Sequence, residues 1–302
     1  MDDELRIAAF GWIAEQHSVH GGVVPRSELV HGFTVGGRRF AAVGPTGIWR
    51  PRGFQLPLSI TTAPDSPYDD SWTPDELLRY RYRGSDPAHR DNVGLREAMR
   101  TRTPLIYFFG AMPNRYIPVW PVFILEDRPQ DLSFVVAVDP AYAFGVGAPT
   151  ADLVTKLDPG SALGIQRYVT SVTKRRLHQA TFRERVVTAY AATCTLCSLR
   201  HRELLDAAHI IPDAQHGGEP VVPNGLCLCK IHHAAFDQNI IGVSPDYLVH
   251  VRSDILEEVD GPMLQHGLQG LHGKQILLPR HRTDRPDRDR LSMRFEQFRK
   301  AG

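Results

Sequence analysis

The sequence lacks a hydrophobic run long enough to cross a membrane, and its N-terminus lacks the basic-then-apolar layout of a signal peptide. Its longest apolar stretch, Tyr116–Leu125, has ten residues and contains two prolines. An excess of one charge is also absent, because 35 lysines and arginines face 34 aspartates and glutamates. These absences argue against a membrane protein and against a polybasic tail, and we expect a soluble protein of the cytoplasm.

The length and the patterning indicate two domains. A chain of 302 residues is long for one compact domain and sufficient for two. With 42% apolar and 23% charged residues, neither disorder nor a coiled coil is expected. Short β-type runs separated by turns dominate the first half, and helical periodicity begins near residue 172. We predict an α+β protein with a β-rich N-terminal domain (1–148), a linker (149–170) and a small C-terminal domain (171–302).

Cysteine is scarce, and all four cysteines lie within 36 residues. A disulfide framework would spread cysteines along the chain, so a local cluster with interleaved histidines indicates a metal site. Zinc favours thiolate and imidazole ligands in pairs two or three residues apart. Two such pairs are present, and they predict a structural Cys3His zinc site made of Cys194, Cys197, Cys229 and His232.

Two features of this zinc site stay open in the sequence. Cys227 lies two residues before Cys229 and fits the spacing of a zinc knuckle poorly, so we interpret it as a buried packing cysteine. His232 and His233 are neighbours, and neighbours on a helix point about 100° apart, so only one of them can face the zinc. We assign His232 to the zinc; the exchanged assignment and a group of ordinary core thiols are the alternatives.

A second set of polar residues is interleaved with the zinc ligands. Residues 208–212 read AHIIP, and residues 224–237 read NGLCLCKIHHAAFD. This pattern resembles the His-Asn-His (HNH) nuclease motif of the ββα-metal fold. The resemblance implies that His209 is the general base for water and that Asn224 stabilises the intervening loop and orients His209. It also implies that His233 binds a catalytic divalent ion.

The chemistry explains these residue types. Phosphodiester hydrolysis needs a deprotonated water, which an imidazole can supply near neutral pH, and positive charge from Mg²⁺ or Mn²⁺ on the phosphate and the leaving oxygen. Asp237 lies one helical turn after His233 and is expected to bind the same ion. Many relatives carry an acidic residue directly before the catalytic histidine, where this chain has Ala208. We expect Asp206 to compensate, as a ligand or by orienting His209.

The N-terminal part carries a looser resemblance. It contains YDD at 68–70, LRYRYRG at 78–84, RDN at 90–92 and NRYIPVWPV at 114–122. This order resembles the SET- and RING-associated (SRA) domain, a PUA-like barrel that binds modified cytosine. The resemblance implies a pocket that takes a flipped base, stacks it between aromatic rings and bonds its Watson–Crick edge.

By that resemblance Tyr68 and Tyr82 form the stacking pair, and Asp69 or Asp70 accepts a hydrogen bond from the exocyclic amine of cytosine. Arg83 then binds the base or a phosphate. The alternative is ordinary strand composition, because tyrosines commonly pack in cores. Further arginines suit neutralisation of the DNA backbone, namely Arg79, Arg81, Arg90 and Arg96.

Together the two resemblances predict a PUA/SRA-like barrel with flanking helices, followed by a zinc-stabilised ββα-metal domain. They imply a Mcr-type, modification-dependent restriction endonuclease that binds duplex DNA with modified cytosine at the nucleoid. Because one chain carries one active site, cleavage of both strands implies a homodimer or two recruited copies. Two other classes stay open: an HNH nuclease for unmodified or structured DNA, and a non-catalytic zinc-stabilised regulator that binds nucleic acid.

Overall fold

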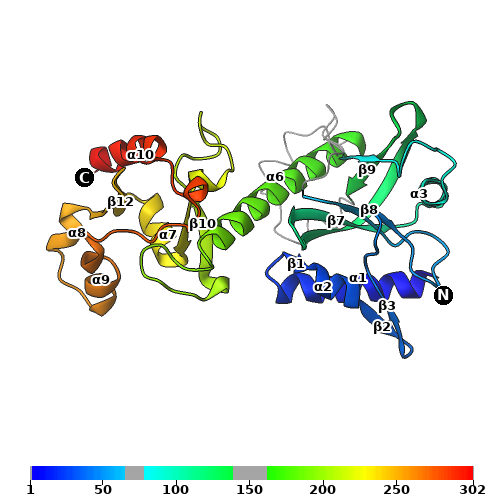
Figure 1. Ribbon diagram of the computed structural model, residues 1–302, viewed down its shortest axis with the longest axis horizontal. Coiled ribbons are helices and arrows are strands. Elements are labelled where there is room, and N and C mark those ends of the chain that lie inside the picture. The colour runs from blue at the N-terminus through cyan, green and yellow to red at the C-terminus, as the bar shows by residue number, and fades with distance from the viewer. Residues whose placement is uncertain (1, 65–77, 139–161, 302) are drawn as a thin grey trace. The chain divides into compact units, whose positions relative to one another are not determined.

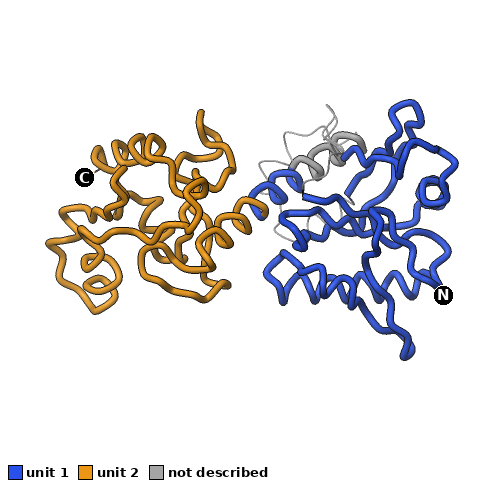
Figure 2. Tube along the Cα trace, in the orientation of Figure 1, with its two compact units in different colours: residues 1–180 blue, residues 181–302 orange. Residues whose placement is uncertain are grey.

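The computed structural model describes residues 2–64, 78–138 and 162–301, with backbone only for 162–171. The predicted pocket residues Tyr68, Asp69 and Asp70 lie outside these ranges. The chain divides into two compact units, residues 1–180 and 181–302 (Figure 2). None of the helices in the described ranges combines the length and the apolar character that a membrane span requires.

The division between the units differs from the prediction. Helix α6 (Ala162–Ala189) begins inside the predicted linker (149–170) and continues past the end of unit 1. Leu177 packs in a small apolar cluster of unit 1, whereas Phe182 and Val186 belong to the core of unit 2. The first part of α6 therefore packs in unit 1 and its second part in unit 2. The helix includes residues 162–170, which the composition had indicated as part of a linker.

Unit 1 is built on a curled sheet with the strand order β4-β5-β7-β8-β9-β6, and β1 also pairs with β8 (Figure 1). β5 and β7 are parallel, and the other neighbours are antiparallel. These strands lie in the first half of the chain, where the sequence analysis predicted short β-type runs. The strands are β1 (Val24–Pro25), β4 (Ile48–Trp49), β5 (Ser59–Thr62), β6 (Leu78–Arg81), β7 (Leu105–Met112), β8 (Arg115–Arg128) and β9 (Ser133–Val138).

Helices cover both faces of this sheet, which explains why its central strands are apolar on both sides. Along β7, Ile106 and Phe108 point into a core with the first helix, and Leu105 and Tyr107 point into a second core on the other face. Strands buried on both faces are expected to be continuously apolar. The remaining elements are α1 (Asp2–Val19), α2 (Arg26–His31), α3 (Arg90–Arg100), η1 (Pro129–Asp131) and a hairpin of β2 (Phe33–Val35) and β3 (Arg38–Phe40).

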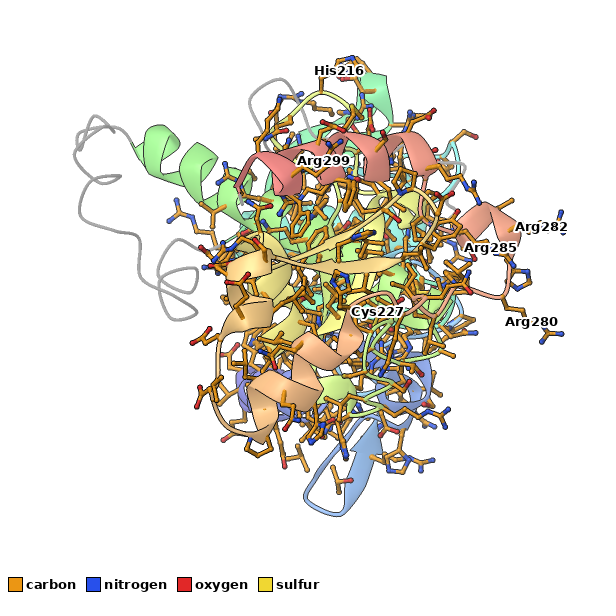
Figure 3. All side chains as sticks on the ribbon, turned by 90° about the vertical axis from the view of Figure 1, so that its left-hand side faces the viewer. His216, Cys227, Arg280, Arg282, Arg285 and Arg299 are labelled. Atoms are coloured by element: carbon orange, nitrogen blue, oxygen red, sulfur yellow. The ribbon has the colours of Figure 1, made fainter. Side chains whose placement is uncertain are left out.

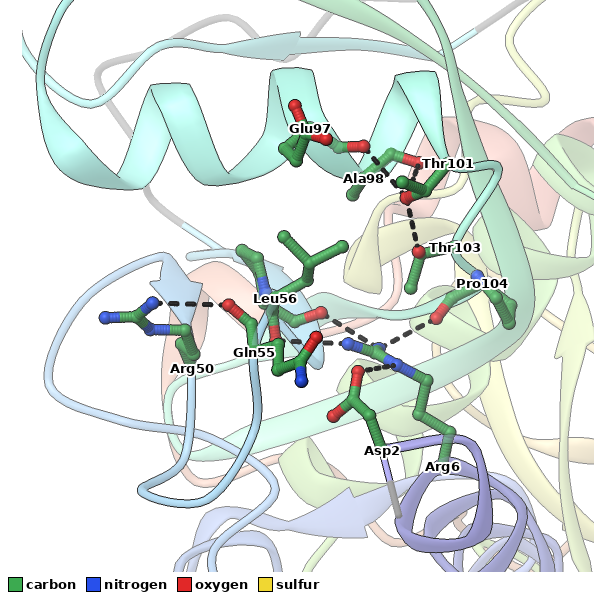
Figure 4. Close-up of polar contacts among 11 residues, drawn as sticks. Asp2, Arg6, Arg50, Gln55, Leu56, Glu97, Ala98, Thr101, Thr103 and Pro104 are labelled. Carbon is green, nitrogen blue, oxygen red and sulfur yellow. Dashed lines mark hydrogen bonds and ion pairs between the residues drawn. The ribbon is translucent and has the colours of Figure 1, made fainter.

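Arg6 fastens α1 to the loops at the edge of the sheet. Its side chain is 2% exposed and donates to the carbonyl oxygens of Leu56, Pro57 and Pro104 at 3.0, 2.9 and 3.0 Å (Figure 4). It also forms an ion pair with Asp2 at 3.2 Å. A guanidinium has five N–H donors in a fixed plane, so one side chain can satisfy several carbonyl groups at once. The hydrogen bonds to three carbonyl groups and the ion pair with Asp2 therefore compensate for the cost of burying the Arg6 charge.

Replacing Arg6 by methionine should lower the free energy of unfolding of unit 1 by about 3–5 kcal/mol, because three buried carbonyl groups lose their donor. Urea unfolding followed by tryptophan fluorescence measures this, since all four tryptophans belong to unit 1. Arg50→Met is the control, because Arg50 is exposed and donates one bond to Gln55 at 3.2 Å. That variant should shift stability by less than about 0.5 kcal/mol. Equal losses in the two variants would contradict the anchoring role of Arg6.

Unit 2 contains a ββα arrangement. Strands β10 (Leu205–His209) and β11 (Gly225–Cys229) form an antiparallel hairpin, and α7 (Lys230–Asp237) follows directly. The order agrees with the one that the sequence resemblance implies. The remaining elements are η2 (Arg202–Leu204), η3 (Val222–Asn224), β12 (Ile241–Val243), β13 (Val249–Val251), α8 (Ser253–Glu257), α9 (Pro262–Gly267), η4 (Gln269–Leu271), η5 (Arg282–Asp284) and α10 (Arg288–Ala301).

Candidate functional site

The register of the hairpin decides which side chains meet. Leu205 lies opposite Cys229, and His209 lies opposite Gly225. Because alternate residues of a strand face opposite sides, Asp206 and His209 are on different faces of β10. Helix α6 packs on the His209 face and α7 packs on the Asp206 face. His209 therefore contacts α6, whereas Asp206 contacts α7 and is also paired with Arg183 of α6 at 3.6 Å.

His209 is half-buried against Phe182 of α6. The two rings are stacked, with centroids 4.0 Å apart and planes 20° apart. The Nε2 atom of His209 is buried and has no hydrogen-bond partner among the residues that the structure describes. Burial lowers the pKa of His209, and the nearby Asp213 and Asp237 oppose this shift only in part. A lowered pKa keeps the imidazole neutral at neutral pH, as a general base requires.

Gly225 makes this stacking possible. A Cβ atom at Gly225 would lie 2.4 Å from Cγ2 of Val186 and 3.0 Å from the ring of Phe182. Glycine is therefore needed for α6 to approach the hairpin closely enough to place Phe182 against His209. Sequence reasoning assigned no role in the site to Gly225 or to Phe182. A local motif carries no signal for a contact between segments this far apart in the chain.

Asn224 is fully buried and closes the connection between β10 and β11. Its Oδ1 accepts a hydrogen bond from the amide of Ile211 at 2.9 Å, and its Nδ2 donates to the carbonyl oxygens of Ile211 and Glu219 at 3.0 and 3.1 Å. The amide of Ile210 donates to the Asn224 carbonyl at 2.9 Å. Asn224 thus holds the backbone that follows His209 in place.

His233 of α7 lies between two carboxylates. Its Nδ1 is 3.4 Å from Oδ2 of Asp206, and its Nε2 is 3.4 Å from Oδ2 of Asp237. The hydrogen bond with Asp206 raises the pKa of His233. Burial raises the pKa of Asp206, but the hydrogen bonds from His233 and the Ala207 amide outweigh it, and the pKa is about 2. Asp206 is therefore ionised throughout the physiological range.

Of the two roles expected for Asp206, a metal ligand or an orienter of His209, this geometry contradicts the second. Asp206 contacts the ring of His233 instead, because the alternation along β10 turns it toward α7. A carboxylate that accepts from one nitrogen of an imidazole leaves the other nitrogen free for a metal ion. Here the other nitrogen, Nε2, faces Asp237, so one nitrogen and one carboxylate oxygen on successive turns of α7 could hold a divalent ion.

The four residues predicted for zinc come together. Their ligand atoms all lie within 4.8 Å of one another. Nδ1 of His232 is 3.5 Å from Sγ of Cys194 and 3.3 Å from Sγ of Cys229, and the Sγ atoms of Cys197 and Cys229 are 4.0 Å apart. Tetrahedral zinc with these ligands requires separations of about 3.5–3.8 Å. The set therefore fits one zinc ion with no position left for water.

The structure also separates the two adjacent histidines. Nε2 of His232 lies 2.7 Å from the carbonyl oxygen of Gly267, so this nitrogen carries the proton and Nδ1 faces the thiolates. His232 thus belongs to the thiolate cluster and His233 to the carboxylates, as assigned. Cys227 lies outside the cluster in the core of unit 2, where burial raises the pKa of its thiol to about 12. It is a packing cysteine.

Tyr82 in unit 1 is not placed for stacking on a base. It is 4% exposed, its ring packs against Phe134 at 4.6 Å, and its hydroxyl bonds to Asp127 and Arg96. A ring held inside a core offers no free face to a nucleobase. The assignment of Tyr82 to a stacking pair is therefore wrong for this structure, and the alternative of a core tyrosine holds. Arg96 is likewise paired with Asp127.

The other predicted arginines of unit 1 differ in exposure. Arg83 forms an ion pair with Asp91 at the start of α3, and Arg90 beside it is 81% exposed. Arg79 and Arg81 are half-buried on β6, and Leu78 and Tyr80 alternate with them as buried residues. Of this set, Arg90 is the most open to a phosphate.

Unit 1 also contains an apolar pocket that sequence reasoning missed. Its volume is about 200 Å³, and its lining includes Ile117, Val119, Trp120 and Leu177. His17 lies in the same lining, with its ring edge-on to Trp120 at 5.6 Å between centroids. None of the residues predicted for base binding lines this pocket among those that the structure describes. The pocket lies between the end of α1, strand β8 and residues 173–180 of α6, which are far apart in the sequence.

The comparisons with known proteins agree with the C-terminal geometry. Residues 194–244 match the family model described as HNH endonuclease, a range that begins at the first zinc ligand and includes His209, Asn224 and His233. A solved structure titled modification dependent TagI restriction endonuclease is 18% identical, with 80% of this chain and 82% of that chain covered and a TM-score of 0.32. A score that low does not establish a shared fold. No curated protein matches the chain. Residues 194–244 thus form a domain of the HNH endonuclease type.

Replacing Cys197 by serine should reduce bound zinc from about one per chain to nearly none and lower the unfolding temperature of unit 2. The reason is that a structural zinc contributes its binding free energy to folding, on the order of 10 kcal/mol. Elemental analysis and calorimetry of the full chain measure both effects. Cys227→Ala is the matched control, since Cys227 is outside the cluster, and it should keep its zinc. If Cys227→Ala lost its zinc while Cys197→Ser kept it, the assignment of Cys197 to the zinc site would be refuted.

Proposed function

We propose that this HNH endonuclease hydrolyses phosphodiester bonds of duplex DNA with the help of Mg²⁺ or Mn²⁺, and that it selects DNA carrying modified cytosine. The observation that supports the catalytic part best is the half-buried His209, with an unpartnered Nε2, near an imidazole–carboxylate pair. An unsatisfied buried polar atom costs about 1–3 kcal/mol, so its retention calls for a function. A general base needs such a free lone pair.

In the proposed reaction His209 accepts the proton of the attacking water. Stacking on Phe182 limits rotation of the ring, and Asn224 fixes the backbone that follows it. His233 and Asp237 would hold the divalent ion, which supplies positive charge to the phosphate and the departing 3′ oxygen. Asp206 keeps the proton of His233 on Nδ1, so that Nε2 is the nitrogen available for the ion.

The zinc site would hold this arrangement together. Cys229 precedes α7 and His232 lies in its first turn, so both belong to the segment that presents His233. Cys194 and Cys197 bring in the segment that follows α6, the helix that carries Phe182. One zinc ion bound by all four residues would therefore connect the helix behind His209 with the helix that holds the catalytic ion.

Recognition of modified DNA is assigned to unit 1 on the strength of its resemblance to the SRA domain and its curled sheet with helices on both faces. Since Tyr82 is a core residue, we assign the base to the pocket lined by Trp120 and His17. The indole of Trp120 would offer one ring face for stacking a flat, flipped base in this cavity of about 200 Å³. Cleavage of both strands would use two copies of the chain.

His209→Ala should lower the rate of Mg²⁺- or Mn²⁺-dependent plasmid cleavage by about 10²–10⁴-fold, because general-base catalysis contributes roughly that factor. DNA affinity and zinc content should not change. His216→Ala is the control, since His216 is an exposed histidine of the connection between β10 and β11, and it should cleave like the parent chain. Undiminished cleavage by His209→Ala would overturn the assignment of the base.

Selectivity is measured with matched duplexes that carry cytosine, 5-methylcytosine or 5-hydroxymethylcytosine at one position. We expect faster cleavage of at least one modified duplex, and we expect Trp120→Leu to abolish that preference because a stacking ring is lost. Tyr82→Phe should retain the preference, since it removes only the hydroxyl contact to Asp127 and Arg96. Equal rates on all duplexes would indicate a nuclease for unmodified DNA.

A further inference from the structure

A loop rich in arginine lies against the connection that carries Asn224. Residues 280–290 read RHRTDRPDRDR, with five arginines and three aspartates. The loop is outside the range that matches the HNH family, which ends at residue 244. No step of the proposed reaction uses it, and base recognition is assigned to the other unit. Its charge and its position therefore call for a separate explanation.

Three contacts hold this loop beside the active-site connection. The amide of Asp287 donates to the carbonyl oxygen of Pro223 at 2.9 Å, immediately before Asn224 in the chain. Arg290 forms an ion pair at 2.7 Å with Glu219, whose carbonyl oxygen accepts a hydrogen bond from Nδ2 of Asn224. The hydroxyl of Tyr247 donates to the Pro286 carbonyl at 3.1 Å. These contacts fix the position of the loop. It touches Pro223, which lies two residues before Gly225, the residue paired with His209.

The charged residues of the loop divide into two groups. Asp287 accepts from the amide of Arg290 at the start of α10, and Arg288 lies over the ring of Tyr247 at 5.0 Å. These side chains serve the fold. Arg280 and Arg282 are exposed, and no carboxylate among the described residues forms an ion pair with either of them. Figure 3 shows both at one edge of the unit, with Arg285 close by.

The surface at this place is grooved. A groove of about 530 Å³ is lined by Pro223, Tyr247 and the loop residues 282–289 except Asp284. This lining includes Arg282, Arg285 and Arg288 together with Asp287 and Asp289, and Arg280 lies next to it in the chain. Buried Pro279 and Pro286 flank Arg280, Arg282 and Arg285 and restrict the backbone. Guanidinium groups bind phosphate oxygens in pairs of parallel hydrogen bonds, and contacts of this kind fix the register of a protein on DNA.

We propose that Arg280, Arg282 and Arg285 bind the phosphate backbone of duplex DNA next to the cleaved bond and thereby position the strand at His209. The inference rests on the proposed nuclease function and adds the surface that holds the substrate. Phosphate contacts carry no sequence information, so this surface contributes affinity equally to modified and unmodified duplexes. Each lost contact should also reduce the salt dependence of binding by about one unit in the slope of log K against log salt.

The test compares two double variants of the full chain that each remove two positive charges. Arg280→Gln with Arg282→Gln alters the proposed surface without breaking any ion pair within the described ranges. Arg299→Gln with Lys300→Gln alters the exposed end of α10, away from the labelled loop in Figure 3. Binding to a 30-base-pair duplex is measured by fluorescence anisotropy in Ca²⁺ at several salt concentrations, and cleavage is measured in Mg²⁺.

For the loop variant we expect a dissociation constant at least about tenfold higher near 0.15 M salt and a salt slope smaller by about two. KM should rise while kcat at saturating DNA stays the same, and the α10 variant should bind like the parent chain. An unchanged dissociation constant and slope in the loop variant would overturn the proposal, and so would a loss confined to modified duplexes. The binding measurement is independent of cleavage, so undiminished cutting by His209→Ala would overturn the proposed function alone.

Discussion

The antiparallel pairing of β10 and β11 is the constraint on which the site depends. It places Gly225 opposite His209, and only a residue without Cβ allows Val186 and Phe182 of α6 to approach there. The same pairing turns Asp206 toward α7, where it meets His233. A shift of one residue would exchange these two faces, since side chains alternate along a strand. One hairpin thus places His209, the proposed base, against α6 and brings Asp206 to His233 of α7.

The thiolate–imidazole cluster has a related effect at the opposite end of the hairpin. Cys229 and His232 belong to the turn from strand to helix, and Gly267 of α9 orients the ring of His232. In a unit of about 120 residues, a metal centre of this kind can hold segments in place that the apolar core alone would leave loosely packed. Stability and the proposed catalysis would be coupled here, because His233 directly follows His232 of this cluster.

In the N-terminal unit the sequence resemblance predicted strands correctly but not the role of Tyr82. The strands that carry the arginine–tyrosine segment are present, but Tyr82 packs against Phe134 and bonds to Asp127, so its ring belongs to the core. Alternation along a strand predicts that the tyrosines of this segment lie on its buried face. It does not show whether that face borders a binding pocket or a packed core. The cavity beside Trp120 is formed instead by segments far apart in the chain.

The sequence by itself determined which side chains of the C-terminal unit would cluster, because ligand pairs two or three residues apart act through local geometry. It separated Cys227 from the Cys3His cluster and His232 from His233 for the same reason. Only the tertiary structure decided which partner Asp206 takes, that Phe182 stacks on His209, and that the loop 280–290 lies against Pro223. These are contacts between segments 27 to 64 residues apart in the chain, and no local pattern encodes which faces of two distant segments will meet.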